Sequence, residues 1–302
     1  MNKLQALQVL LEVAEAGGFA KAAQRLGVAT SSVTRLIDAL EAELGAALLT
    51  RTPRKVSLTD AGAAYTEQVA KVLDDLAEAD GNVADSGGAL VGTLRVSVPS
   101  VYSRVRLAAH LADFMAAHPR VTLHIVADDH YADLAHDRFD VAIRIGLPAQ
   151  DPRLIARTLV DNPRYVVASP DYLARAGRPS RPAELATHAC LRFAYGGNYR
   201  ARQVWSFQRG GEQERVDVKG RLTSNNADML LSGVQGGQGL ALLPVWLVEA
   251  AIADGRLAHL FPDWEATPHD DQAVVYAAYL PNRRHSGKVH ALIQFLASRL
   301  NP

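Results

Sequence analysis

Two short runs near the N-terminus combine small hydroxyl side chains with basic ones. The residues in these runs that could bond DNA are Thr30, Ser31, Ser32, Thr34, Arg35, Arg51, Arg54 and Lys55. Hydroxyl and guanidinium groups can bond base edges as well as phosphate oxygens, whereas basic side chains on a loop bind phosphates without sequence choice. The first run therefore predicts contacts that select a DNA sequence, and the second predicts contacts to the DNA backbone.

A second kind of chemistry is expected where helices begin after strands. Pro99 to Ser103 stands between a strand-like and a helical stretch, and Asn225 and Asn226 precede another helical stretch. Free N–H groups at a helix start favour an anionic group, so a small anionic or polar metabolite could bind between these two places. The alternative is that each short polar side chain only caps its own helix.

No constellation for catalysis or metal binding is visible in the sequence. His130 and His136 stand six residues apart without an acid at metal-ligand spacing, and the single Cys190 excludes a cysteine-rich metal site. The glycine-rich run 233–239 follows a helical stretch instead of opening one, so it predicts a helix end and not a phosphate-binding loop. We expect no enzyme activity, no metal and no cofactor, and we interpret Cys190 as a packed thiol.

Three helices within the first 50 residues would position the DNA-contacting side chains. Apolar residues recur at helical spacing over residues 4–14, 19–26 and 33–44, and a glycine follows each stretch. From periodicity alone, a helix-turn-helix and any small helical bundle fit equally well. Residues 48–59 favour the helix-turn-helix, because they are typical of a strand, a turn with Pro53 and basic residues, and a second strand, which together form a wing.

A long helix over residues 60–86 is predicted next, with Thr59 as its N-cap. Apolar residues at alternating spacings of three and four form a heptad seam, which is typical of a coiled coil. The seam that we expect to pair two chains consists of Tyr65, Val69, Val72, Leu76, Ala79 and Val83. The alternative is an amphipathic helix that lies on its own domain.

From Leu90 onward, strand-like stretches alternate with helical ones. Residues 94–98, 121–126 and 141–145 are strand-like, and residues 102–117 are helical. This alternation predicts a parallel α/β sheet with helices on both faces. About 210 residues of such a pattern are more natural as two lobes than as one sheet, with crossings near Asp161 and Ala266.

Composition excludes several classes of protein. The chain has 302 residues, of which 48% are hydrophobic and 21% are charged, so it is not a wholly disordered chain and has room for two or three domains. The formal net charge is zero, so any nucleic-acid site must be local, and residues 1–59 carry seven basic and five acidic side chains. No signal peptide and no membrane-spanning stretch is apparent, so we expect a cytoplasmic protein without a membrane partner.

Three blocks of sequence carry a family resemblance: residues 19–28 (FAKAAQRLGV), 31–41 (SSVTRLIDALE) and 58–62 (LTDAG). In order and spacing they resemble the LysR-type transcriptional regulators, and the resemblance extends to the C-terminus. It implies antiparallel pairing of two linker helices in a dimer, and a sensing domain like a periplasmic binding protein. Gly18 departs from the family's N-capping serine, and Ala29 and Thr30 replace its serine-glutamine entry to the recognition helix.

The resemblance also implies which side chains face an effector, because ligands of such domains bind beyond the carboxyl ends of strands, between the lobes. The expected effector-binding residues are Ser100, Val101, Tyr102, Asp128, Arg144, Gly146, Phe193, Tyr195, Asn225 and Asn226. Two roles are open for Arg144, which are contact with the ligand and an ion pair with Asp128.

These inferences predict a winged helix-turn-helix DNA-binding domain over residues 1–59, a linker and dimerisation helix over 60–89, and an α/β effector domain over 90–302. The effector domain would have two lobes of the type 2 periplasmic-binding-protein kind, with lobe I over about 90–161 and 267–302 and lobe II over about 162–266. The expected function is sequence-specific regulation of transcription in response to a small-molecule effector. The expected partners are double-stranded operator DNA, a second copy in a homodimer or homotetramer, and RNA polymerase.

Two other classes of function stay open at this point. One is a small-molecule-binding or enzymatic α/β protein whose N-terminal helices serve only dimerisation. The other is a nucleoid-packaging protein, which would bind DNA without sequence preference and would not need a two-lobed sensor. Sequence-selective, salt-dependent binding in a mobility-shift experiment separates the regulator from both.

Overall fold

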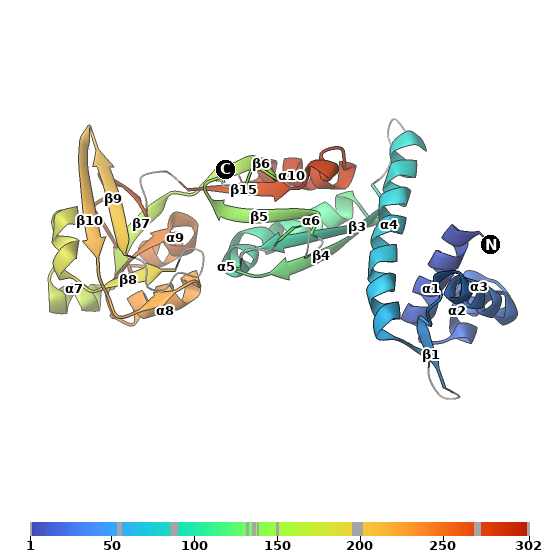
Figure 1. Cartoon of the computed structure of the whole chain (residues 1–302). Coiled ribbons are helices and arrows are strands. Elements are labelled where there is room, and N and C mark those ends of the chain that lie inside the picture. The colour runs from blue at the N-terminus through green and yellow to red at the C-terminus, as the bar shows by residue number, and fades with distance from the viewer. Residues whose placement is uncertain are drawn as a thin grey trace. The chain divides into compact units, whose positions relative to one another are not determined.

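The computed structural model of the chain describes residues 2–52, 56–84, 90–130, 133–134, 137, 139–148, 151–194, 202–268 and 273–300, with the backbone alone for residue 74 and residues 77–84. The chain divides into two compact units, Met1–Gly92 and Thr93–Pro302 (Figure 1). Among the helices of these described residues, none has both the length and the apolar character needed to cross a membrane.

The first unit contains three short helices, a hairpin and a long helix, as the sequence predicts. The elements are α1 (Lys3–Ala16), α2 (Phe19–Leu26), α3 (Thr30–Leu44), β1 (Leu49–Arg51), β2 (Val56–Leu58) and α4 (Asp60–Ala84). Gly17, Gly27 and Gly45 end the three short helices with φ angles of 67°, 66° and 66°, in the left-handed region that glycine adopts without strain. Thr59 caps α4, because its Oγ1 accepts a hydrogen bond of 2.9 Å from the Gly62 N–H.

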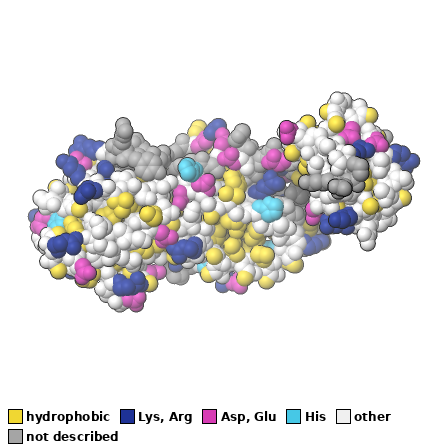
Figure 2. Space-filling model, turned by 90° about the horizontal axis from the view of Figure 1, so that it is seen from below, with side chains coloured by type: hydrophobic (Ala, Val, Ile, Leu, Met, Phe, Trp, Pro, Cys, Tyr) yellow, Lys and Arg dark blue, Asp and Glu magenta, His cyan; other side chains and the backbone are white. Residues whose placement is uncertain are grey.

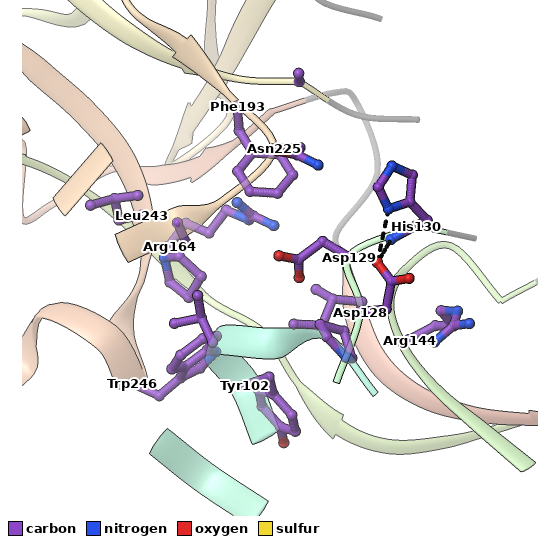
Figure 3. A pocket seen from close by; sticks show the side chains of 16 residues that line it. Tyr102, Asp128, Asp129, His130, Arg144, Arg164, Phe193, Asn225, Leu243 and Trp246 are labelled. Carbon is purple, nitrogen blue, oxygen red and sulfur yellow. Dashed lines mark hydrogen bonds and ion pairs between the residues drawn. The ribbon is translucent and has the colours of Figure 1, made fainter. Parts of the chain in front are cut away.

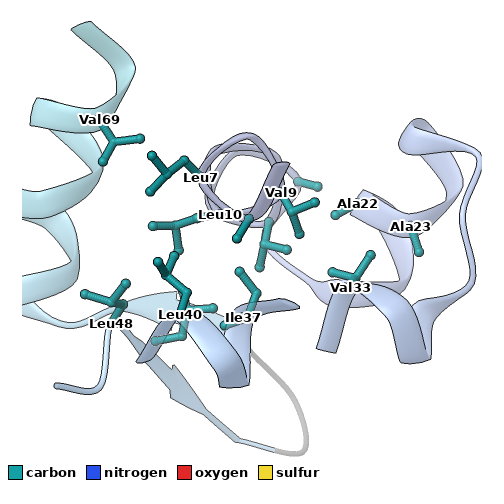
Figure 4. Packing of buried hydrophobic residues seen from close by; sticks show 14 residues of the cluster. Leu7, Val9, Leu10, Ala22, Ala23, Val33, Ile37, Leu40, Leu48 and Val69 are labelled. Atoms are coloured by element: carbon teal, nitrogen blue, oxygen red, sulfur yellow. The ribbon is translucent and has the colours of Figure 1, made fainter. Parts of the chain in front are cut away.

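One hydrophobic core holds these elements together (Figure 4). Leu10 of α1, Ile37 and Leu40 of α3, and Leu48 before the hairpin are all buried in it. Val33 and Ile37 repeat at the spacing of one helix face, so α3 turns that face inward and leaves its opposite face to solvent. This packing is the reason that the helix-turn-helix holds a fixed shape.

The prediction of one continuous dimerisation seam along α4 needs a correction. Val69 is 5% exposed and lies in the core of its own unit (Figure 4), and Tyr65 packs against that core. Val72 and Leu76 are 56% and 38% exposed. Ala79 lies where only the backbone is described. The first half of the stripe, Tyr65 and Val69, therefore packs inside its own unit, because α1 and the hairpin lie beside the start of α4. Of the described side chains, Val72 and Leu76 are the ones left exposed to pair with a second chain.

The second unit contains two main sheets, one in each lobe, and a smaller third sheet in the second lobe. In the first lobe the strand order is β4-β3-β5-β15-β6. The strands are β3 (Gly92–Val98), β4 (Val121–Ala127), β5 (Val141–Gly146), β6 (Ile155–Asp161) and β15 (Val274–Tyr279). Helical segments α5 (Ser100–Tyr102), η1 (Ser103–Leu107) and α6 (Ala108–Ala117) run without a break after β3, and α10 (Gly287–Leu300) lies near the end of the chain. The middle segment η1 is a π-helix, a local widening of the helix that often accompanies functional sites.

The second lobe has a sheet of order β11-β8-β12-β7-β13 and a smaller sheet of order β10-β9-β14. Its strands are β7 (Arg164–Ala168), β8 (Cys190–Phe193), β9 (Gln203–Arg209), β10 (Glu212–Val218), β11 (Thr223–Ser224), β12 (Leu240–Pro244), β13 (Ala258–Leu260) and β14 (Glu265–Thr267). Its helices are α7 (Pro170–Ala176), η2 (Pro182–Thr187), α8 (Ala227–Gln235) and α9 (Val245–Ala253), and the short turn η4 (Pro281–Arg283) belongs to the first lobe.

Both main sheets are mixed, which corrects the prediction of a parallel sheet. Strand β3 runs parallel to β5, but β15 is antiparallel to both β5 and β6. In the second lobe, β12 is parallel to β8 and antiparallel to β7. The reversed strands follow from the chain path, because the chain leaves the first sheet after β6 and returns to it as β15.

Asn162 ties the two crossings together. Its N–H donates to the Ala273 carbonyl oxygen over 3.2 Å, so the outgoing and returning segments bond to each other. Its Oδ1 accepts a hydrogen bond of 2.8 Å from Trp246 Nε1, at the start of α9. Asn162 is buried, and it therefore fixes where α9 stands relative to the passage between the lobes.

Candidate functional site

Helix α3 presents the side chains that the sequence predicts to read DNA. Thr30, Ser31 and Arg35 are exposed, whereas Ser32 and Thr34 are half-buried. The Thr34 hydroxyl donates to the Thr30 carbonyl oxygen over 3.0 Å, so it already has a partner within the helix. Three of the five predicted side chains thus lie on the outer face of the helix, at its N-terminal end and one turn later.

The hairpin β1–β2 is antiparallel, with Leu49 opposite Leu58 and Arg51 opposite Val56. Arg54 and Lys55 lie outside the described residues, and Arg51 is the predicted wing residue that the structure places. Its Nη2 lies 2.7 Å from an oxygen of Asp38 and 2.7 Å from an oxygen of Glu41, both on α3. Arg51 is therefore held by two carboxylates of its own unit.

A cavity of about 400 Å³ lies between the two lobes of the second unit (Figure 3). This size falls in the range of small-molecule sites. Its apolar wall includes Tyr102 from the first lobe and Phe193, Leu243 and Trp246 from the second. The Tyr102 and Trp246 rings meet edge to face with centroids 5.2 Å apart, so aromatic side chains of both lobes close one side of the cavity.

Two arginines bring positive charge to this cavity. Arg144 on β5 and Arg164 at the start of β7 both line it, and both are buried. Arg144 donates to the Ser97 hydroxyl oxygen over 3.0 Å and to the Ile143 carbonyl oxygen over 2.9 Å, which fixes its guanidinium group. A buried guanidinium group strongly favours a nearby anion, because the interior screens charge less than water does.

Asp128 and His130 form a pair on the same side of the cavity as Arg144 (Figure 3). One Asp128 oxygen accepts the His130 N–H at 2.9 Å, and the ring Nδ1 of His130 lies 2.8 Å from the same oxygen. These bonds lower the pKa of the Asp128 carboxyl, and the charge of Arg144 adds to the effect. Arg144 lines the cavity and its charge acts on Asp128, and both of its predicted roles stay predictions.

The two helix starts that the sequence singles out are joined by Asp129. Its Oδ1 accepts the Ser100 N–H at 3.0 Å, and its Oδ2 lies 3.4 Å from the donor Asn226 Nδ2. Asn226 also caps α8, because its Oδ1 accepts the N–H groups of Asp228 and Met229. The N–H that was expected to meet an anionic ligand therefore already meets a carboxylate of the chain itself.

A second bond between the lobes lies close by. Arg104 Nη2 on η1 donates to both carboxylate oxygens of Asp228 on α8, at 2.8 and 2.7 Å. Arg104 is exposed, so the pair is screened by solvent and contributes little stability by itself. Together with Asp129 it nevertheless fixes which parts of the two lobes meet.

The structure brings most of the predicted effector-binding residues to one place. Six of them line the cavity: Val101, Tyr102, Asp128, Arg144, Phe193 and Asn225. Ser100 and Asn226 lie beside it as partners of Asp129, Gly146 pairs with Val274 at the end of β5 without lining the cavity, and Tyr195 lies outside the described residues.

Sequence reasoning missed Asp129, Arg164, Leu243 and Trp246, all of which line the cavity. The rule that ligands bind beyond the carboxyl ends of strands could have found Asp129 after β4 and Trp246 after β12. Arg164 stands three residues beyond the predicted crossing at Asp161, which is a second signal of the same kind.

No cluster of three or more metal-binding side chains occurs within the described part of the chain. Cys190 begins β8 and is buried, which confirms its interpretation as a packed thiol, and burial raises the pKa of that thiol to about 12. Such a thiol is neutral at physiological pH and a poor nucleophile.

Comparison with known proteins agrees with this architecture. Residues 4–63 match the model of the family described as "Bacterial regulatory helix-turn-helix protein, lysR family", and residues 87–301 match the "LysR substrate binding domain". The regulator PtxR of Pseudomonas aeruginosa is 35% identical over 299 residues, which cover 98% of this chain and 93% of PtxR. The regulator CrgA of Neisseria meningitidis serogroup C is 34% identical, with 97% of both chains covered. These relatives are named as transcriptional regulators and not as enzymes.

Solved structures of full-length regulators share the fold. The structure of CrgA from Neisseria meningitidis has a TM-score of 0.59 at 30% identity, and 99% of each chain is covered. The full-length structure of AphB, a virulence activator of Vibrio cholerae, has a TM-score of 0.58 at 25% identity, with 98% of each chain covered. The chain belongs to the LysR family, and it is a LysR-type transcriptional regulator with an N-terminal helix-turn-helix DNA-binding domain and a C-terminal substrate-binding domain.

Proposed function

We propose that this regulator changes its action on DNA when a small carboxylate-bearing metabolite enters the cavity between the two lobes. The observation that carries the proposal is a cavity of about 400 Å³ lined by residues of both lobes, with two buried arginines in its wall. A ligand held there touches both lobes at once. It can therefore favour one arrangement of the lobes over another, which is what a signal requires.

The composition of the wall supports this class of ligand. Arg144 and Arg164 offer guanidinium groups that suit a carboxylate, and Tyr102, Phe193 and Trp246 offer apolar faces for the rest of the molecule. The Ser100 N–H is a poorer place for the anionic group, because Asp129 already accepts it and would repel a second carboxylate. We therefore assign the anionic end of the ligand to the arginines.

The carboxylates of Asp128 and Asp129 in the cavity wall favour a different group of the ligand. Two carboxylates attract a hydroxyl, an amide or an amino group of the ligand, since each can donate a hydrogen bond to them. A metabolite that carries both a carboxylate and a hydrogen-bond donor fits both the arginines and these acids. A plain hydrocarbon acid would leave the two acids without a partner from the ligand.

The test uses the full chain and a duplex selected from random DNA by repeated binding to the parent protein. Small organic acids, with and without a second donor group, are screened for a rise in melting temperature and then for a change in DNA affinity. We expect Arg164→Gln to lose the response to the active compound while its affinity for the duplex stays that of the parent. Arg256→Gln is the matched control, because Arg256 is exposed and does not line the cavity.

Two outcomes would contradict different parts of the proposal. If Arg164→Gln responds to the compound as the parent and the control do, the ligand does not bind at the arginines. If the parent binds no selected duplex in a salt-dependent manner, the role in DNA-dependent regulation fails instead, and the two failures are distinct.

We also propose that two copies pair through the exposed end of α4. Val72 and Leu76 are apolar and exposed there, on the stripe whose first half is already buried in its own unit. Burying such residues against a second copy removes apolar area from water, which favours association. Pairing along this stripe would present two recognition helices to the two halves of an operator.

A second contact between copies, which would build a tetramer, is proposed at α6 and β4. Hydrophobic side chains gather over this part of the second unit (Figure 2), where Met115 and Val126 are exposed. Strand β4 is an edge of its sheet, and an unpaired edge beside an apolar surface favours association. Sedimentation of Met115→Glu/Val126→Glu should show dimers where the parent shows tetramers. An unchanged assembly would exclude this surface.

RNA polymerase is the remaining proposed partner, and the cytoplasm, where bacterial DNA lies, is the proposed site of action. Transcription with purified polymerase on a template that carries the selected duplex tests the polymerase contact. We expect the regulator to change transcript yield from that template and to leave a template without the duplex unchanged. Equal yields with and without the regulator would count against the contact.

A further inference from the structure

The base of the wing is fastened to the recognition helix by one side chain, Glu41 on α3. Its Oε1 accepts the N–H groups of Leu48 and Leu49 at 2.7 and 2.9 Å, and its Oε2 accepts Arg51 Nη2 at 2.7 Å. Glu41 is half-buried, whereas its partner Arg51 is exposed. A single carboxylate therefore holds both the start of β1 and its last residue.

Arg51 makes two more contacts that reach different elements. Its Nη2 lies 2.7 Å from Asp38 Oδ1, one helical turn before Glu41. Its guanidinium carbon lies 4.9 Å from the centre of the Phe19 ring, which begins α2 and packs against the core of the unit. Arg51 thus connects the wing with both helices of the helix-turn-helix.

The local charge argues against a phosphate contact for Arg51. One guanidinium group stands between two carboxylates, so the cluster of Arg51, Asp38 and Glu41 carries a net charge of about −1. A phosphate group gains little from a cation that two acids already neutralise, and it is repelled by the excess acid. The geometry instead suits a group that fixes the angle between the wing and the recognition helix.

We infer that Arg51 is a positioning residue for DNA recognition, which acts through Glu41 and does not itself bind the DNA backbone. This replaces the prediction that Arg51 is one of the wing's phosphate contacts. Sequence-selective binding then depends on the Arg51–Glu41 bond, because base contacts from α3 and backbone contacts from the wing must be made together.

Substituting either partner of the Arg51–Glu41 bond tests this inference. Glu41→Gln keeps an oxygen to accept the Leu48 and Leu49 N–H groups but loses the acceptor for Arg51, and it removes a negative charge near DNA. If only charge mattered, this variant would bind DNA more tightly. We expect the reverse, a roughly tenfold weaker affinity for a duplex selected by the parent protein, with little change for unselected DNA.

Arg51→Gln should cost the same roughly tenfold, and the double variant Glu41→Gln/Arg51→Gln should be no more than about threefold worse than either single variant, because both break one bond. The dependence of affinity on salt should keep the slope of the parent, since no phosphate contact is lost. Glu43→Gln is the matched control, because it removes an acid of the same helix that pairs only with Lys3 among the described residues. Its selective binding should equal that of the parent.

Two results would overturn the inference. One is a fall of about one unit in the salt slope of Arg51→Gln, equal for selected and unselected DNA, which marks a phosphate contact. The other is a Glu41→Gln protein that binds the selected duplex as tightly as the parent or more tightly. Asp38→Asn is an independent test if Glu41→Gln or Arg51→Gln has a lowered melting temperature. It removes only one carboxylate partner of Arg51, so it should weaken selective DNA binding by a smaller factor.

Discussion

The DNA-binding unit and the substrate-binding domain gather their functional side chains in opposite ways. In the first, the recognition helix and the hairpin contribute side chains from residues 30–58, which form one short stretch of chain. In the second, the cavity takes side chains from Pro99 to Trp246, from both lobes. A sequence motif can therefore specify the first site, whereas only the tertiary structure specifies the second.

The two regions also differ in what surrounds their charges. Arg35 on α3 is exposed, but Arg144 and Arg164 in the cavity are buried. An exposed charge attracts DNA over a long range and is weakened by salt, whereas a buried charge acts on one adjacent group with little screening. The comparison predicts that salt controls the first site and that shape and charge complementarity control the second.

The first prediction concerns a substitution that destabilises the DNA-binding unit at one close backbone contact. Gly62 approaches Leu48 so closely that a Cβ there would lie 1.9 Å from the Leu48 carbonyl oxygen. That oxygen is fixed by the Thr59 N–H at 2.9 Å, so it has little room to move. Gly62→Ala should destabilise this unit by roughly 3 kcal/mol, more than the gain of at most about 1 kcal/mol from helix propensity.

The measurement is thermal unfolding of the full chain, followed by circular dichroism and by DNA binding. Gly18→Ala serves as the control, because a Cβ at Gly18 meets nothing within 4 Å. We expect a loss of at most about 1 kcal/mol for it, because Gly18 is the N-cap of α2 and alanine is a poorer N-cap than glycine. Selective DNA binding should be lost for Gly62→Ala and ligand binding in the other domain retained. Equal stability of the two variants would mean that the close approach is not needed.

The second prediction concerns the surface that joins two copies. Val72→Asp/Leu76→Asp should raise the dimer dissociation constant by at least about 100-fold, because the variant would place charge in an apolar contact. It should not unfold the protein, since both side chains are exposed in a single chain. Sedimentation and circular dichroism together separate the two effects.

Val72→Ile/Leu76→Met keeps the contact apolar and of similar volume, so it should remain dimeric. Val69→Asp offers the contrasting case, because Val69 is buried in its own unit and the variant should unfold that unit before it dissociates. A Val72→Asp/Leu76→Asp protein that stays fully dimeric would exclude the exposed end of α4 as the interface.

These residues also show how far sequence patterns reach. Periodicity placed Tyr65, Val69, Val72 and Leu76 on one stripe of a helix, and the structure agrees that they lie on α4. Periodicity does not say what covers a stripe, because covering a helix with its own domain and covering it with a second chain need the same apolar residues. The distinction at Val69 came only from the position of α1.

The effector site shows the same limit for charged residues. The rule about strand ends led to Asp128 and Phe193, because the first follows a strand and the second ends one. It did not lead to Asp129 as the partner of Ser100 and Asn226, since that bond joins helix starts from two lobes far apart in sequence. Hydrogen-bond partners at such distances depend on the chain crossings, which local sequence does not encode.

The third prediction concerns the reactivity of the buried Cys190 thiol in the second lobe. Burial raises the pKa of the Cys190 thiol to about 12, so almost no thiolate is present at pH 8. The folded protein should therefore react with a thiol-specific reagent at least about 100-fold more slowly than the same protein in denaturant. A free thiol peptide at the same pH is the control, and rapid labelling of the folded chain would contradict the structure.

The last prediction has the smallest expected effect and tests the cavity wall itself. The His130 N–H and then the His130 ring lower the pKa of Asp128, so the folded-state pKa lies below the unfolded value of about 3.9. The stability from this carboxylate is present above the unfolded pKa and is lost as the pH falls through the folded pKa. The Asp128 side chain is 50% exposed, so solvent screening keeps this contribution small.

His130→Ala removes the ring but keeps the backbone N–H, which is the larger cause of the lowered Asp128 pKa. The pKa of Asp128, followed by carbon NMR, should rise only part of the way to its ordinary value, and His124→Ala, which changes an exposed histidine of β4, should leave it unchanged. An Asp128 pKa that stays the same in His130→Ala would show that the ring does not lower it. The His130 backbone N–H would then be the bond from this residue that lowers the Asp128 pKa.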